Sequence, residues 1–218
     1  FEVEVVATDG LPKLGGDDFD ASLQKIIKKK FKKNTKEEIE EEDFTRSEAE
    51  DEKKSLSKRD IKIRIDRKFY AVSMSEFEDE ISSLVVQTEM ICGSVLESAN
   101  LKLSDIKEVF LAGGSTRIPL VYESVKRAFK MDPTKTINVD EIVSLGASIY
   151  AAYKGDRSKL NSAQKASIEK ISVEDITPAY FGCIVSDIDK EREEWISVVS
   201  IVIDKNRKRP CSNTKTYY

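Results

Sequence analysis

Hydrophobic residues recur along this chain with two different periods, and each period predicts a different kind of element. Between Phe19 and Phe31, five apolar residues recur every three or four positions, which predicts an amphipathic helix over residues 17–33. In residues 61–65 isoleucine alternates with charged residues, which predicts a strand, and a partner strand is expected directly after it. The same patterns predict a sheet built from residues 1–8, 60–72 and 106–112, and further helices over 46–57, 75–99, 118–130 and 140–153.

The last two of these helices each carry one apolar face. Val121 and Val125 recur at helical spacing in residues 118–130. In residues 140–153 the apolar side is formed by Val143, Ala147, Tyr150 and Ala151. Both faces are expected to point into the protein.

Residues 110–119, FLAGGSTRIP, combine a strand end, a two-glycine turn and a helix start. The apolar run 109–111 is typical of a covered strand. Gly113 and Gly114 have no Cβ, so another backbone or a ligand can come close. Ser115 and the threonine after it can cap the following helix. Free N–H groups at such a helix start can face a nucleotide, although a tight connection without a ligand is the alternative interpretation.

The predicted helix 46–57 is polar, and Glu50, Lys53, Lys54 and Ser57 fall on one of its faces. The spacing alone favours an exposed face with an ion pair between Glu50 and Lys54. The alternative is a nucleoside-facing stripe. In that arrangement a carboxylate accepts hydrogen bonds from ribose hydroxyls and a cationic side chain lies over an adenine ring.

Composition excludes several classes of protein. The 218 residues are 35% charged with a net charge of −4, so the overall charge gives no reason to expect a nucleic-acid partner, although a lysine-rich run can by itself indicate a nucleic-acid patch. No apolar run is long enough to span a membrane. The absence of histidine excludes His-based catalysis and His metal sites from this segment. Three widely spaced cysteines predict free thiols. The lysine-rich run 25–36 and the acidic run 37–43 predict a solvated helix face followed by an acidic loop.

Five motifs together resemble the 70-kilodalton heat-shock (DnaK-type) chaperones, in the order of that family. GGSTRIP at 113–119 resembles the family's adenosine-binding loop, and LGGDDFD at 14–20 resembles its strand-to-helix turn LGGEDFD. EDEKKSLS at 50–57 resembles the adenosine-holding pattern E-x-x-K-R-x-x-S, and NVDEIVSLGAS at 138–148 resembles N-P-D-E-A-V-A-x-G-A-A. DITP at 175–178 resembles the start of the family's peptide-binding domain.

Four positions depart from the family pattern. Lys54 replaces the usual arginine, and lysine lacks the planar guanidinium that stacks on a ring, so weaker adenine binding is expected. Val139 replaces a proline. Ser172 and Glu174 interrupt what is usually a leucine-rich interdomain linker.

The resemblance implies an α/β (α+β) fold class: the second lobe of the actin-like ATPase fold, a sheet covered by helices, followed by a β segment. It divides the chain into that lobe at 1–155, a linker at 156–175 and the beginning of a β-type substrate-binding domain at 176–218. The chain has no initiator Met, which suggests a fragment. The implied cofactor is ATP or ADP, and its contacts are expected from Glu50, Lys53, Lys54, Ser57, Gly113, Gly114, Ser115, Arg117 and Asp140.

No catalytic residue and no metal ligand is expected in this segment, because the family's phosphate loops, catalytic residues and magnesium ligands precede the matching region. ATP hydrolysis is therefore expected of the full-length protein and not of this segment alone.

The function implied is part of an ATP-dependent chaperone for protein folding and the stress response. Its implied partners are unfolded or extended client peptides, a J-domain co-chaperone and a nucleotide exchange factor, with no nucleic acid and no membrane. A cytoplasmic location is expected, and the endoplasmic reticulum stays open. Two alternatives remain: a divergent nucleotide-binding exchange factor or scaffold, and another actin-fold ATPase such as a sugar kinase.

Overall fold

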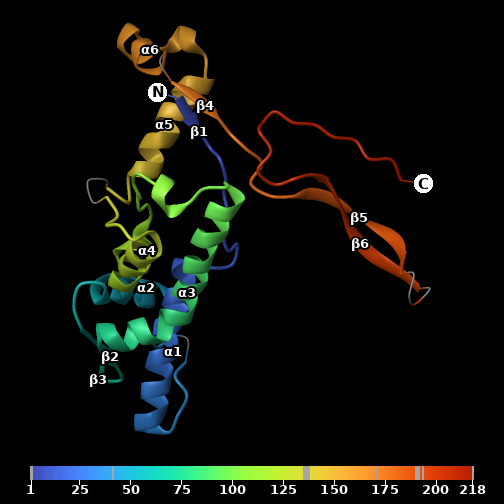
Figure 1. Ribbon diagram of the computed structural model, residues 1–218. Coiled ribbons are helices and arrows are strands. Elements are labelled where there is room, and N and C mark those ends of the chain that lie inside the picture. Colours follow the sequence, from blue (N-terminus) through green and yellow to red (C-terminus); the bar gives the residue numbers. More distant parts are fainter. Residues whose placement is uncertain are drawn as a thin grey trace. The chain divides into compact units, whose positions relative to one another are not determined.

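The structure is a computed structural model that describes residues 2–40, 42–134, 138–169, 171–189, 192 and 194–217. Helices and strands are mixed along the chain (Figure 1). Two compact units form: one contains Gly10–Ser94 and Leu101–Leu145, and the other contains Phe1–Asp9, Val95–Asn100 and Gly146–Tyr218. The elements are β1 (Glu2–Glu4), α1 (Gly16–Thr35), α2 (Arg46–Leu56), β2 (Ile61–Ile65), β3 (Lys68–Val72), α3 (Met74–Ser98), η1 (Leu103–Asp105), η2 (Gly114–Arg117), α4 (Pro119–Phe129), α5 (Ile142–Lys154), η3 (Arg157–Lys159), α6 (Ser162–Ile168), β4 (Ser172–Glu174), β5 (Phe181–Asp189) and β6 (Glu194–Ile203).

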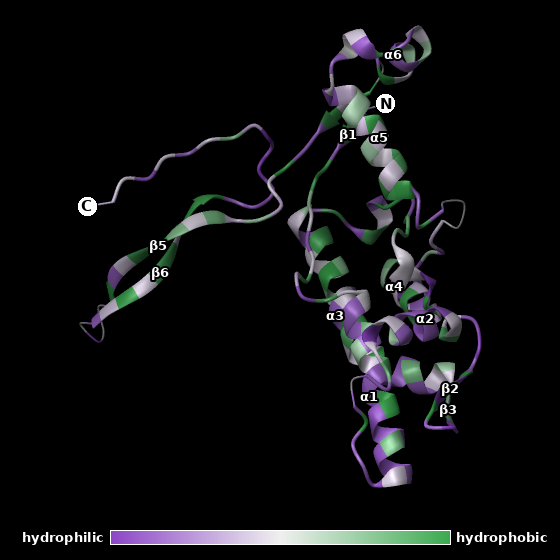
Figure 2. Ribbon diagram, turned by 180° about the vertical axis from the view of Figure 1, so that it is seen from behind, coloured by the Kyte–Doolittle hydropathy of each residue, from purple (hydrophilic) through white to green (hydrophobic). Residues whose placement is uncertain are grey.

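The core of the first unit is made by one face of α1, the β2–β3 hairpin and the first half of α3. Hydrophilic and hydrophobic residues are interleaved along α1 (Figure 2). The predicted stripe of this helix is confirmed, because all five of its apolar residues are buried. In β2 the isoleucines are buried while Lys62 and Arg64 are exposed, so the predicted alternation is also confirmed. From α3 the core receives Phe77, Ile81 and Val85.

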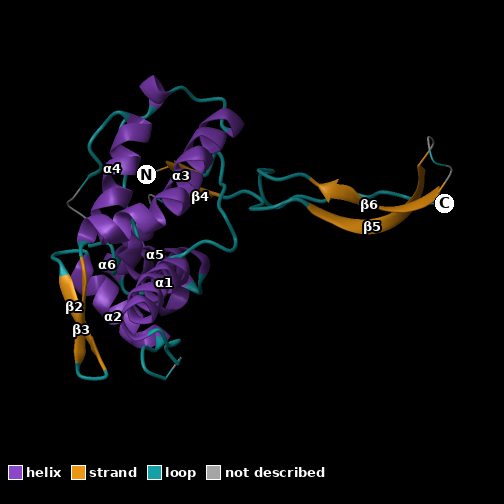
Figure 3. Ribbon diagram, turned by 90° about the horizontal axis from the view of Figure 1, so that it is seen from below, coloured by secondary structure: helices purple, strands orange, loops and turns teal. Residues whose placement is uncertain are grey.

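The hairpin of β2 and β3 is closed by Asp66 and Arg67, which both have positive φ angles. Two consecutive left-handed residues suit the twist of a tight antiparallel hairpin. Elsewhere β1 pairs with β4 in parallel, and β5 pairs with β6 in antiparallel. Among the described residues every sheet has two strands (Figure 3).

The single sheet expected from 1–8, 60–72 and 106–112 is therefore wrong. β1 pairs instead with β4, which lies in the segment expected to be a linker. The segment 106–112 contributes only an isolated bridge between Phe110 and Thr134. Phe110 is 55% exposed, and Val109 and Leu111 are half-buried, so the apolar run is not enclosed as a buried strand would be.

The apolar side of α5 is also not buried as expected. Val143 is 67% exposed, and Ala147, Tyr150 and Ala151 are exposed as well. Helical spacing determines which residues share a face, but a second element is needed to cover that face. By contrast, Val121 and Val125 of α4 are half-buried, as expected for an inward face.

Residues 156–175 contain more regular structure than a plain linker. Helix α6 begins after Asn161, whose side chain accepts from the backbone N–H of Gln164, while the Gln164 side chain accepts from Asn161 in return. This reciprocal capping satisfies two backbone donors of the first turn. The boundaries 1–155, 156–175 and 176–218 themselves stay a prediction. In the described part of the chain no helix is both long and apolar enough to cross a membrane.

Candidate functional site

In the two-glycine turn Gly113 has a φ of +91°, a region that favours glycine. A short 3₁₀ turn, η2, follows, and the hydroxyl of Thr116 donates back to the carbonyl of Gly113 at 2.7 Å. Helix α4 begins only at Pro119, so Ser115 and Thr116 do not cap it. A carboxylate oxygen of Glu78 in α3 accepts from the backbone N–H of Leu120 at 3.0 Å and supplies that cap.

The loop at 138–140 lies beside this turn. The N–H of Gly113 donates to the carbonyl of Val139 at 2.9 Å. The Arg117 guanidinium forms a hydrogen-bonded ion pair with the Asp140 carboxylate. Two of the motifs found in the sequence are thus joined, and Arg117 is held by Asp140 although both side chains remain half-exposed.

Helix α2 is fixed at its start and along its inner side. The Thr45 hydroxyl accepts from the N–H of Glu48. The Glu48 carboxylate accepts from the N–H and hydroxyl of Thr45, and these bonds hold the pKa of Glu48 below its usual value. Ala49 and Leu56 are buried. Because Ala49 and Leu56 face the core, the polar residues on the remaining sides of α2 are available for other contacts.

Two neighbouring lysines of α2 have different surroundings. The Lys54 ammonium is exposed and lies 3.0 Å from a carboxylate oxygen of Glu50 and 3.1 Å from one of Asp51. Hydrogen bonds to Glu50 first and Asp51 second raise the pKa of Lys54. The Lys53 side chain is only 11% exposed and turns toward α1. Ser57 donates from its hydroxyl to the Lys53 carbonyl, so Glu50, Lys54 and Ser57 make these contacts within their own helix and its cap.

Lys53 meets the start of α1 and the two-glycine turn at one point. Its Nζ donates to the Gly16 carbonyl at 3.0 Å and lies 2.6 Å from Oδ1 of Asp20. A Cβ added at Gly16 would lie 3.4 Å from Nζ of Lys53 and 3.4 Å from Oγ of Ser115. The structure therefore brings Lys53 and Ser115, 62 positions apart in the sequence, to the same side of Gly16.

Sequence reasoning missed Asp20 as a part of this arrangement. Asp20 is 3% exposed and lies on the buried side of α1 with Leu23 and Ile27. The spacing of these three residues is i, i+3 and i+7, so a carboxylate within an apolar stripe was a detectable signal. A charge in such a position needs a partner of opposite charge, and the nearby Lys53 is that partner.

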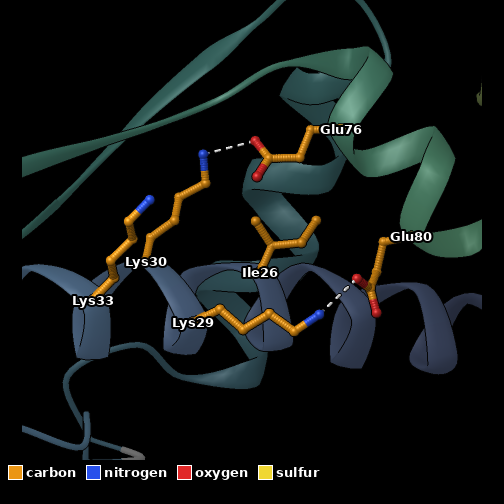
Figure 4. A pocket seen from close by; sticks show the side chains of 6 residues that line it. All are labelled: Ile26, Lys29, Lys30, Lys33, Glu76 and Glu80. Atoms are coloured by element: carbon orange, nitrogen blue, oxygen red, sulfur yellow. Dashed lines mark hydrogen bonds and ion pairs between the residues drawn. The ribbon is translucent and has the colours of Figure 1, made fainter.

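A second polar surface lies further along α1. It contains a pocket of about 310 Å³. Figure 4 shows the side chains that line this pocket: Ile26, Lys29, Lys30, Lys33, Glu76 and Glu80. Four of its five charged side chains are paired: Lys30 lies 2.7 Å from Glu76, and Lys29 lies 3.1 Å from Glu80. The hydrogen bond from Lys25 is the main reason why the pKa of Glu80 lies below its usual value. With a rise of 1.5 Å per residue, this pocket is about 20 Å along the helix from Gly16, so it is separate from the Lys53–Ser115 arrangement.

No group of three or more His, Cys, Asp or Glu side chains placed to hold a metal ion occurs within the described ranges. The polar groups gathered at Gly16 are an ammonium, a hydroxyl and backbone groups, with Asp20 buried behind them. Such a set can hydrogen-bond a neutral or anionic polar ligand.

The comparisons with known proteins give the same family as the resemblance of the motifs. A model of the Hsp70 protein family matches residues 2–201. Chaperone protein HscA of Buchnera aphidicola subsp. Schizaphis graminum is 34% identical over 218 residues, covering 98% of this chain and 32% of that protein. HscA of Buchnera aphidicola subsp. Acyrthosiphon pisum (strain Tuc7) is 34% identical over 221 residues, covering 98% of this chain and 33% of that protein.

The family match covers more than half of the chain and includes every motif that surrounds Gly16. The chain belongs to the Hsp70 family. It spans about a third of the length of the curated relatives it matches.

Proposed function

We propose that the protein is an ATP-dependent chaperone of the Hsp70 type and that this chain supplies the adenosine-binding half of its nucleotide site. The observation that carries the proposal is the meeting of Lys53 and Ser115 at Gly16, because these residues come from three different motifs. A Cβ at Gly16 would touch both polar atoms, so glycine leaves room there for a ligand group.

Each expected contact has a distinct chemical role. The Glu50 carboxylate accepts from the ribose hydroxyls, and the Lys54 ammonium lies over the adenine ring after leaving its ion pair with Glu50. Ser57 offers a hydroxyl from the same helix. Gly113 and Gly114 allow the nucleotide close to the backbone. The residues of the opposite loop complete the set: Ser115, and Arg117 held by Asp140.

Hydrolysis belongs to the full-length protein in this proposal. ATP with bound Mg²⁺ supplies the transferable phosphoryl group, and the other lobe of the family's ATPase domain would hold the metal. The residues of this chain bind and orient the nucleoside, and they take no proton from water.

The proposal extends to the organisation of the chain. Residues 1–155 are assigned to the second lobe of an actin-like ATPase domain, 156–175 to the interdomain linker and 176–218 to the start of a β-type peptide-binding domain. The antiparallel β5–β6 pair supports a β-type region after residue 176. Client peptides, a J-domain protein, a nucleotide exchange factor and a cytoplasmic location belong to the same proposal.

Calorimetric titration of the full-length protein with ADP tests the nucleotide site. Glu50→Ala is expected to weaken ADP binding because the ribose loses its acceptor. Glu52→Ala is the matched control, since it removes a carboxylate of the same helix two positions away, on another face. Equal affinities for the wild type and both variants would refute the assignment of α2 to the nucleoside.

A second candidate is a nucleotide-binding exchange factor or scaffold without its own ATPase cycle. It is favoured by one observation, namely that Lys54 replaces the family's arginine and lies paired with two carboxylates of its own helix. Steady-state ATPase assays of the full-length protein, with and without an unfolded client, separate the two candidates. Client-stimulated hydrolysis supports the chaperone, whereas nucleotide binding without turnover supports the scaffold.

A further inference from the structure

Asp20 ends the LGGDDFD motif and was not among the expected nucleotide contacts, yet its buried carboxylate lies 2.6 Å from Lys53, the residue at the centre of the candidate site. We infer that Asp20 is a positioning residue: it fixes the Lys53 ammonium against the Gly16 carbonyl, so that Lys53 faces the nucleoside in one preset geometry. The inference rests on the proposed function and concerns a residue that contacts no ligand itself.

The burial of both partners makes their pairing obligatory. The Asp20 side chain is 4% exposed, and Lys53 is the cation beside it at 2.6 Å. Oδ1 of Asp20 makes no hydrogen bond of good geometry within the described structure, so charge attraction to Lys53 is what holds it. An uncompensated charge at such a depth is strongly disfavoured. The ammonium is therefore kept at this position whether or not a ligand is present.

The number of donors on the ammonium shows what remains for a ligand. An ammonium has three N–H groups. One is donated to the Gly16 carbonyl, and the Asp20 carboxylate holds the ammonium by charge at 2.6 Å, so among the described residues one of the three donors is used in a hydrogen bond. The neighbouring hydroxyl of Ser115 adds a second polar group at the same point beside Gly16. Asp20 thus fixes the place of the ammonium, from which its remaining donors can reach a ligand.

Presetting a lysine matters because this side chain is long and loses much rotamer freedom when it is immobilised. If the immobilisation is already complete in the free protein, ligand binding does not bear that cost. Without Asp20 the ammonium would be free to adopt other rotamers, and the affinity for the nucleoside would fall.

Adenosine is the appropriate probe, since it has no charge. Removing a carboxylate therefore cannot change its long-range attraction to the protein. In the full-length protein, Asp20→Asn keeps the shape of the side chain and removes its charge. We expect adenosine to bind about tenfold more weakly, measured by calorimetry. Asp17→Asn is the matched control: this carboxylate is in the same turn but is exposed and paired with Arg46, so adenosine affinity should stay within about twofold.

The decisive readout is the dependence on Lys53. In a Lys53→Met background, Asp20→Asn should cause no further loss of adenosine affinity, because Asp20 acts only through the ammonium. A purely structural role would give the same change in both backgrounds or none in either, and either result overturns the inference. Tighter adenosine binding by Asp20→Asn would overturn it as well. If the wild type binds neither ADP nor adenosine, the proposed function itself fails, and the inference falls with it.

A measurement on the unaltered protein covers the case in which Asp20→Asn does not fold. A buried ammonium held by two partners exchanges its protons slowly and gives a visible ¹⁵N–¹H signal, which is identified by its loss in Lys53→Arg. We expect this signal in the free protein and a shift of it on adding adenosine. Absence of the signal without ligand, or no shift on saturation, would contradict a preset Lys53.

Discussion

The α1–α3 core and the β5–β6 pair contain apolar residues at similarly regular spacing, but these residues end in opposite environments. Leu23 and Ile27 of α1 are fully buried. In the β pair, Ile184 and Trp195 are 76% and 74% exposed, although the register places apolar residues of both strands on one face. The difference shows that regular spacing places apolar residues on one face of an element. That face stabilises the fold only where a second apolar face packs against it.

The same contrast holds for charged pairs. Lys53 and Asp20 are buried together, whereas Lys208 in the other unit reaches Glu4 and Glu174 at 2.6 and 2.7 Å on the surface. The hydrogen bond to Glu174, followed by the one to Glu4, raises the pKa of Lys208. Both lysines have two close polar partners, but the loss of a partner has a severe consequence only where water cannot replace it.

The largest effect is therefore expected from breaking the buried pair. Lys53→Met leaves Asp20 charged among apolar residues and should lower the free energy of unfolding by about 3–5 kcal/mol. Lys208→Met should leave the urea midpoint unchanged, because both of its partners are solvated. Urea unfolding followed by circular dichroism measures both variants. Similar midpoints for the two would show that the burial of Lys53 does not matter.

Shortening one apolar side chain in each region tests how much its packing contributes to stability. Leu23→Ala removes a fully buried side chain and should cost about 2–5 kcal/mol of unfolding free energy. The matched change in the β pair, Ile184→Ala, should stay within about 0.5 kcal/mol. The slope of the urea transition should be the same in both variants, so that the midpoints report stability alone. A large loss from Ile184→Ala would mean that this face is covered in the full-length protein.

A substitution at Gly16 is expected to change ligand affinity and not stability. Gly16→Ala should weaken ADP binding about tenfold, because the new methyl group fills the space between Lys53 and Ser115. Folding should be unaffected, since 3.4 Å is an ordinary contact distance and alanine is well suited to a first helical turn. Gly15→Ala is the control, because its Cβ would meet nothing within 4 Å. Equal ADP affinities for the two variants would argue against a ligand at Gly16.

The sequence predicts which residues share a face of a helix or strand, but it does not always predict whether that face is buried. The stripe of α1 and the alternation in β2 were predictable because the elements that cover them follow directly in the chain. Val143 and Phe110 were expected to be buried, and both are exposed. A local apolar pattern does not show whether a segment distant in the sequence will pack over it. The pairing of β1 with β4 joins segments 170 positions apart, so no local sequence pattern predicts it.

For the candidate site the same limit applies. Family motifs pointed to Lys53 and Ser115 separately, and only the fold brings both to Gly16. Asp20 was visible as a carboxylate in an apolar stripe, but its partner could not be chosen among the many lysines of the chain without coordinates. Whether these residues bind adenosine stays a prediction.

Acid should affect the α1–α3 surface in a definite direction. The folded-state pKa of Glu80 is lowered mainly by its hydrogen bond from Lys25. The unfolded chain therefore binds this proton at higher pH than the folded protein, and the stabilisation is lost as pH falls from about 4.5 through the lowered folded pKa. Glu80→Gln should flatten the pH dependence of the thermal midpoint in this window. At pH 7–8 it should lower the midpoint slightly, because the ion pair that it removes is fully formed there in the wild type. An unchanged acid slope would mean that the Lys25–Glu80 pair does not persist in solution.

The smallest effect is expected at Lys54, the exposed neighbour of Lys53. If Lys54 covers the adenine, Lys54→Arg should tighten ADP binding by about two- to fivefold, because a guanidinium plane stacks on a ring while the ammonium is strongly hydrated. Lys54→Ala should lose a comparable amount. Both changes should leave the urea midpoint unaltered, because the pair with Glu50 and Asp51 is on the surface. Calorimetry with ADP at two salt concentrations separates stacking from simple charge attraction, since only the latter weakens strongly with salt. Identical dissociation constants for all three proteins would leave Lys54 as a solvated helix residue and restrict the nucleoside contacts of α2 to its other polar residues.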